Sequence, residues 1–164
     1  MHLIEGPVGA GKSTFAAKLS LAQGAPHLNL DEWMATLFSP DRPAEDFWEW
    51  YTERKDRCIQ QIWQVACELV DSDIDAVLEL GLVQSVDRDA FYRRVDGTDY
   101  SLKVYLLDTP LDVRRQRVRD RNAQKGSTYK MEVSDEVFDV ANGFWQAPDE
   151  LECKKRNIEV ITDG

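Results

Sequence analysis

The stretch that most constrains this chain is GPVGAGKST at residues 6–14, which matches the pattern G-x-x-x-x-G-K-[ST] in full. The apolar residues before it predict a strand, and the apolar spacing after Lys12 predicts a helix. Glycines let consecutive backbone N–H groups point inward without a Cβ in the way, and the helix adds the positive end of its dipole. The stretch therefore predicts a loop that holds an anion of high charge density.

Strands and helices alternate along the whole chain. Apolar runs predict strands at residues 2–5, 27–30, 74–80, 101–108 and 158–162. Helical spacing predicts helices after Lys12 and at residues 45–70, 88–95, 110–122 and 134–146, the last with Ser134 as N-cap. Helical connections between strands imply right-handed crossovers and a parallel sheet covered on both faces. We therefore expect one α/β domain over residues 1–164, a three-layer sandwich with five parallel strands.

Composition narrows the class of protein. No apolar run approaches the ~18 residues of a membrane span, and the first residues lack the pattern of a secretory signal. Three cysteines fit no disulfide framework and no metal spacing, which favours a cytoplasmic protein. The net charge of −10 disfavours long nucleic acid as a partner, although five arginines crowd into residues 114–121.

The loop motif predicts a nucleoside triphosphate as its ligand. Lys12 is expected to reach the β- and γ-phosphates, and the Ser13 hydroxyl to bind the Mg²⁺ that bridges them. A guanine-reading Asn/Thr-Lys-x-Asp motif is absent from the sequence, so ATP is the expected nucleotide. The residues expected to bind it are Gly6, Pro7, Val8, Gly9, Ala10, Gly11, Lys12, Ser13 and Thr14.

Four segments carry a family resemblance: GPVGAGKST, LNLDEW, VLELG and VYLLDTPLDVRRQRVRDRN. Together they resemble the small P-loop kinases of the zeta-toxin, chloramphenicol phosphotransferase and gluconate kinase group, often described as AAA-type ATP-binding proteins. The resemblance covers residues 1–122 and implies the P-loop NTPase fold in an adenylate-kinase-like form, with a short lid at about residues 117–131. It also implies transfer of a phosphoryl group from Mg·ATP to a hydroxyl of a small molecule.

Asp31 is the expected catalytic carboxylate. It follows the second strand, so in a parallel sheet it emerges at the carboxyl edge beside the phosphate loop. In the similar kinases an aspartate here accepts the proton of the acceptor hydroxyl. Alternatively, Asp31 only caps the next helix, and Glu32 is then the reserve candidate. Trp33 is expected at the acceptor pocket or in the core, and Arg88 at the acceptor.

Two carboxylates compete for the magnesium ion. Asp108 ends a strand with four apolar residues before it, which favours Asp108 by simple pattern. In the related kinases, however, the third strand lies beside the phosphate-loop strand, and this order favours Glu79. We expect Glu79 to serve the metal, although a glutamate departs from the usual aspartate.

Arg114, Arg117 and Arg121 share one face of their predicted helix by the spacing i, i+3, i+7. The resemblance implies that Arg121 stabilises charge on the transferring phosphoryl group and that Arg117 packs near the nucleotide. The alternative is a solvated helix face paired with Asp112 and Asp120. Residues 122–131 have the polarity of a lid tip. The aromatic group at residues 47–51 covers more than one helix face, so it either packs in the core or lines an acceptor pocket.

Three functions fit these features. The leading one is a kinase for a small-molecule hydroxyl. A nucleotide kinase or polynucleotide-end kinase is the second, and an ATP-dependent binding switch without an acceptor is the third. The residues identify neither the acceptor nor the oligomeric state.

Overall fold

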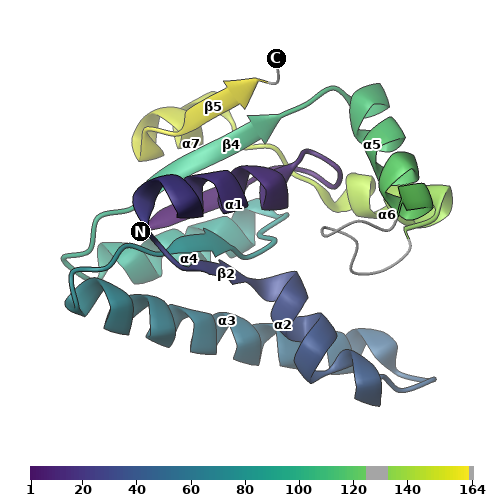
Figure 1. Ribbon diagram of the computed structural model, residues 1–164, viewed down its shortest axis with the longest axis horizontal. Helices are drawn as coiled ribbons and strands as arrows, with labels where there is room; N and C mark the ends of the chain where they lie inside the picture. Colours follow the sequence, from purple (N-terminus) through teal and green to yellow (C-terminus); the bar gives the residue numbers. More distant parts are fainter. Residues whose placement is uncertain (125–132, 163–164) are drawn as a thin grey trace.

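The computed structural model describes residues 1–124 and 133–162 of the chain, and Figure 1 shows their arrangement. In chain order the elements are β1 (His2–Glu5), α1 (Lys12–Gln23), β2 (His27–Asn29), α2 (Leu30–Leu37), the 3₁₀ helix η1 (Ser39–Asp41), α3 (Phe47–Asp71), β3 (Val77–Glu79), α4 (Ser85–Asp96), β4 (Lys103–Asp108), α5 (Leu111–Gln124), α6 (Asp135–Phe144), α7 (Glu150–Arg156) and β5 (Glu159–Thr162).

The five strands form one parallel sheet in the order β2-β3-β1-β4-β5. The predicted fold class is therefore confirmed, and so is the expected position of the third strand beside the strand that precedes the phosphate loop. Because β1 is central, its loop emerges in the middle of the carboxyl edge. Figure 1 shows α5 and α6 at the end of the molecule toward which the arrows of β4 and β5 point.

Helices cover both faces of the sheet. Successive residues of β1 point to opposite faces, so each of them packs under a different helix layer. Leu3 is buried with Ile62 of α3 and Phe91 of α4, whereas Ile4 is buried in a second core with Ala16 of α1. This arrangement gives the three layers that the sequence predicts.

Local details differ from the sequence prediction in a few places. The third strand is shorter than predicted, and α4 starts three residues earlier. Two helices, α2 and α7, were not predicted as separate elements. Each has a polar N-cap, because Asn29 accepts from the backbone of Glu32 at 3.1 Å and Asp149 accepts from the backbone of Glu152 at 2.7 Å.

Four further expectations concern the cap of α6, the cysteines, membrane-spanning helices and the predicted lid. The Ser134 hydroxyl caps α6 as predicted, accepting from the backbone of Val137 at 3.3 Å. The cysteines Cys58, Cys67 and Cys153 are free thiols. Within residues 1–124 and 133–162, no helix has the length and apolar character needed to cross a membrane. Residues 125–131 of the predicted lid lie outside the described residues.

Candidate active site

The loop between β1 and α1 is built on three glycines with positive φ angles, 147° at Gly6, 78° at Gly9 and 92° at Gly11. A Cβ on Gly9 would lie 2.7 Å from the backbone oxygen of Arg114, so the loop packs too tightly against α5 for a side chain. Among the described residues, no side chain caps α1 and its first turn has no acidic residue. The first amides of α1 are therefore available to an anion.

Lys12 folds back over this loop. Its ammonium donates to the carbonyl oxygens of Gly6 and Pro7, both at 2.9 Å. Burial lowers the pKa of Lys12, while the carboxylates of Glu79 and Asp31 oppose that shift. The ammonium is thus bound to the carbonyls of the loop, and Lys12 lines the same cavity as the two carboxylates.

Glu79 ends β3 and is the carboxylate that meets the phosphate loop. The Ser13 hydroxyl donates to Glu79 Oε1 at 2.9 Å, and the side-chain amide of Asn29 donates to Oε2 at 2.7 Å. The ring of His27 lies 3.1 Å from the same Oε2 atom. Glu79 is almost fully buried, so these contacts fix its orientation toward Ser13.

Asn29 and His27 were not identified from the sequence. Asn29 lies directly beside Glu79 in the register of β2 and β3, and His27 precedes it by two residues on the same face. The polar side chains in the strand HLN indicated a contact with another polar group. The sequence did not identify that group, because it does not state which strand lies beside β2. Asn29 therefore has two tasks, because it also caps α2.

The side chains at this point fit a magnesium ion. The oxygens of Ser13 and Glu79 are already in contact, and both are hard ligands of the type that Mg²⁺ prefers. No cluster of three or more His, Cys, Asp or Glu side chains suited to a metal occurs among the described residues. Mg²⁺ takes only one or two protein ligands and completes its shell with phosphate and water, so Ser13 and Glu79 would suffice to hold it.

A cavity of about 280 Å³ opens over the loop. It is lined by residues from β3, α1, α2 and α5 as well as from the loop itself, namely Val8, Gly9, Gly11, Lys12, Ser13, Thr14, Asp31, Glu79, Arg117, Val118 and Arg121. Most of the residues predicted for phosphate, metal and catalysis therefore share one space. Of the other loop residues, Ala10 is buried, and Gly6 and Pro7 hold the Lys12 ammonium.

Asp31 enters the cavity from the first turn of α2. It is not the N-cap of that helix, since Asn29 has this position. Desolvation of its carboxyl group raises the pKa of Asp31, and the nearby charge of Glu79 raises it further. The positive charges of Lys12, Arg121 and Lys55 lower it, but the net shift is upward. A carboxylate with a raised pKa is better suited to accept a proton near neutral pH than an ordinary aspartate.

The five arginines of α5 divide by position. Arg117 and Arg121 line the cavity, and Arg121 Nε is buried without a hydrogen-bond acceptor among the described residues. Arg114 instead holds the loop in place, donating to the carbonyl of Val8 at 3.0 Å. The remaining two, Arg115 and Arg119, pair with acidic residues of α6. Only Arg117 and Arg121 are therefore placed to meet a polyphosphate.

Three further candidates lie away from this cavity. Trp33 is half-buried and packs against the core beneath α3 and α4. Asp108 is exposed at the end of β4, on the other side of β1 from Glu79. Arg88 has no exposed surface, and it donates to both carboxylate oxygens of Glu152 at 2.6 and 2.9 Å. Its burial does not support the predicted contact between Arg88 and an acceptor.

The sheet order and the glycine-rich loop define an α/β protein of the P-loop NTPase class. Residues 1–148 match the family described as AAA domain, and this chain belongs to that family. None of the curated proteins matches the sequence.

Solved structures of similar fold cover nearly the whole chain. A putative kinase from Chloroflexus aurantiacus is 15% identical, with 98% of this chain and 86% of that chain covered and a TM-score of 0.72. A gluconokinase from Sinorhizobium meliloti is 15% identical, with 98% and 81% covered and a TM-score of 0.60. The Mycobacterium tuberculosis APS kinase, solved with AMPPNP and APS, is 16% identical, with 98% and 87% covered and a TM-score of 0.60. At these identities the likeness establishes the fold.

Proposed function

We propose that this protein is a kinase that transfers the γ-phosphoryl group of Mg·ATP to a hydroxyl group of a small molecule. The observation that carries the proposal is that Asp31 lines the same cavity as Lys12 and Ser13. A phosphate loop alone serves any nucleoside triphosphatase, whereas a carboxylate of raised pKa across the cavity is suited to activate an acceptor. The names of two proteins of similar fold, a gluconokinase and an APS kinase, support this choice.

The proposed reaction begins with the acceptor hydroxyl next to Asp31. Its proton passes to the Asp31 carboxylate as the hydroxyl oxygen bonds to the γ-phosphorus. The bond between that phosphorus and the β–γ bridging oxygen breaks, and ADP leaves with the bonding electron pair. Charge spreads over the phosphoryl oxygens during this step, and Lys12 and Arg121 lie in the cavity to stabilise it.

The remaining residues position and neutralise the substrates. The amides at the start of α1 would bind phosphate oxygens, and Ser13 and Glu79 would hold the metal ion. Magnesium, when bound, supplies positive charge to the phosphate oxygens. Asn29 and His27 keep Glu79 turned toward Ser13, so their role is to position the metal ligand rather than to contact substrate.

The decisive experiment replaces Asp31 with asparagine. The wild type is incubated with γ-labelled Mg·ATP and a pool of small-molecule alcohols, and the labelled product is then assayed with Asp31→Asn. Loss of the base is expected to lower acceptor-dependent turnover by about 100-fold. Calorimetry is expected to show Mg·ATP affinity within a fewfold of the wild type, because the phosphate loop is unchanged.

Glu32→Gln tests the neighbouring carboxylate, which was the reserve candidate. This variant is expected to keep most of its turnover, since Glu32 does not line the cavity. Full turnover in Asp31→Asn with a true acceptor would remove Asp31 from the mechanism. If the wild type binds Mg·ATP but gives only acceptor-independent hydrolysis, the kinase proposal is wrong and a binding switch is favoured.

A further inference from the structure

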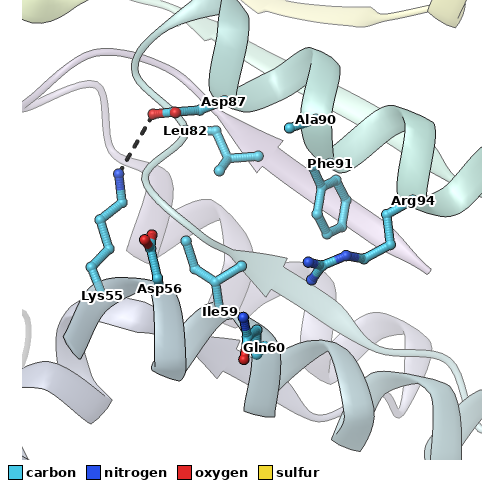
Figure 2. Close-up of a pocket in the computed structure, with 9 residues that line it drawn as sticks. All are labelled: Lys55, Asp56, Ile59, Gln60, Leu82, Asp87, Ala90, Phe91 and Arg94. Atoms are coloured by element: carbon cyan, nitrogen blue, oxygen red, sulfur yellow. Dashed lines mark ion pairs between the residues drawn. The ribbon is translucent and has the colours of Figure 1, made fainter. Parts of the chain in front are cut away.

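A second cavity, of about 290 Å³, lies between α3 and α4, and we call it the α3–α4 cavity. It shares no lining residue with the cavity over the phosphate loop. Figure 2 shows its walls, which are α3 on one side, α4 on the other and Leu82 of the loop after β3. The proposed phosphoryl transfer involves none of the side chains that line it, so the cavity is open to another role.

The middle of the α3–α4 cavity is apolar. Leu82 and Phe91 are only 6% and 4% exposed and belong to the main core, and Ile59 packs against that core. Figure 2 shows these three side chains between charged groups at the two ends of the cavity. The middle therefore favours the carbon chain of a ligand over its polar groups, which would lose water there without gaining a partner.

One end of the α3–α4 cavity is acidic. Lys55 of α3 and Asp87 of α4 form an ion pair at 3.5 Å, which spans the cavity in Figure 2. Asp56 follows Lys55 on α3, and its carboxylate has neither an ion pair nor a hydrogen bond within residues 1–124 and 133–162. Two carboxylates and one ammonium leave this end with a net negative charge. It is therefore suited to a positively charged group.

The other end carries Arg94, from the last turn of α4. Figure 2 shows its side chain extending from α4 toward α3. The guanidinium lies 5.8 Å from the centroid of the Trp63 ring, and in the part of the chain that the structure describes it pairs with no carboxylate. A guanidinium offers a planar fork of N–H donors that matches a carboxylate. This end is therefore suited to a negatively charged group.

The spacing between the two ends limits the ligand. Asp87 is in the first turn of α4 and Arg94 in the last, two helical turns apart, which is about 10 Å along the axis. An α-amino acid is too short to reach both ends, because its ammonium and carboxylate are attached to a single carbon. The cavity volume of about 290 Å³ is at the lower end of the range for ligand pockets, so the occupant is a small molecule.

We propose that the α3–α4 cavity binds a small zwitterion whose ammonium and carboxylate are joined by an apolar chain of several carbons, such as an ω-amino acid. The ammonium lies at Asp56 and Asp87, the carbon chain over Leu82 and Phe91, and the carboxylate at Arg94. A ligand with charge of one sign gains a partner at one end only and is disfavoured. This site is separate from the phosphate cavity and does not depend on the kinase proposal.

The test measures binding of ε-aminocaproate from the backbone amide shifts of the protein in NMR titrations, with and without saturating Mg·AMPPNP. Hexanoate and hexylamine are the matched compounds, because each keeps the carbon chain and only one of the charges. Since an exposed ion pair contributes little, ε-aminocaproate is expected to bind about threefold more tightly than either compound. The shifts are expected at the residues that line the α3–α4 cavity, and the nucleotide is expected to leave the affinity unchanged.

Two variants test the two ends separately. Arg94→Met removes the charge but keeps an apolar stem, and it is expected to lower the affinity for ε-aminocaproate to that for hexylamine. Arg93→Met is its control, since Arg93 is exposed in the same turn and does not line the cavity. Asp56→Asn is expected to lower the affinity to that for hexanoate, with exposed Asp89→Asn as its control.

Three results would overturn the proposed site. The first is that the wild type binds ε-aminocaproate no more tightly than the two compounds with a single charge. The second is an equal effect of Arg94→Met and Arg93→Met. The third is displacement of ε-aminocaproate by Mg·AMPPNP, which would contradict a separate site. No measurement here needs phosphoryl transfer, so failure of this site stays distinguishable from failure of the kinase proposal in the Asp31 experiment.

Discussion

Among single residues, Gly9 has the least room of the phosphate-loop glycines. Gly9→Ala places a Cβ 2.7 Å from the Arg114 carbonyl and forces alanine to a φ of 78°. We expect a loss of about 3 kcal/mol in the free energy of unfolding, from left-handed strain plus overpacking. Gly24→Ala is the matched control, because Gly24 has a φ of 62° with open space around it and incurs only the strain. Urea titrations of both variants measure the difference, and equal losses would contradict the clash.

How far single residues could be predicted depends on whether their partners are local. Lys12 and Ser13 belong to one contiguous motif, so their place at the start of α1, beside the glycine-rich loop, follows from the sequence. The contact of Asn29 with Glu79 joins residues from different strands, and it depends on a register that the sequence does not state. The contact of Arg88 with Glu152 joins two distant helices in the same way, so the sequence does not state it either.

At the scale of helices and strands, apolar periodicity predicted every strand and the longer helices. It placed boundaries less well where capping decides them. Asn29 turns the chain into α2 one residue before the predicted end of its strand, and Asp149 starts the short helix α7. Such caps act through a single side-chain hydrogen bond, which carries no periodic pattern.

Helix α3 acts on α2 through charge. The positive charge of Lys55 on α3 lowers the pKa of Asp31 on α2, whereas desolvation of the Asp31 carboxyl group raises it. Lys55→Met keeps much of the apolar stem but removes the charge, so the pKa of Asp31 is expected to rise. The acid limb of kcat/KM should then move to higher pH, measured as a pH profile with a true acceptor. Arg57→Met is the control, since Arg57 pairs with exposed Glu53. An acid limb that stays in place or moves to lower pH would refute the coupling.

Over the whole molecule, a buried polar cluster joins the central strand to the C-terminal helices. Glu5, the last residue of β1, accepts from the Tyr92 hydroxyl at 3.0 Å. Arg88 lies 3.9 Å from the other Glu5 oxygen and bonds to Glu152 of α7. That second oxygen of Glu5 has no hydrogen-bond donor among the described residues. Because Glu5 directly precedes Gly6, this cluster sets the point from which the phosphate loop starts.

The protonation of Glu5 makes the stability of the whole fold depend on pH. Burial raises the pKa of Glu5 from 4.5 to about 8, and Arg88 opposes this. Between these values the native state binds a proton that the unfolded chain has released, so the free energy of unfolding falls as pH rises. Glu5→Gln has no carboxyl group to titrate at this position, so it lacks this dependence of the free energy of unfolding on pH. Relative to Glu5→Gln, the wild type should therefore lose stability from pH 5 to pH 8 in urea titrations, while exposed Glu45→Gln tracks the wild type. If Arg88 outweighed burial, the pKa of Glu5 would be depressed and the wild type would not lose stability over this range, which would refute the assignment.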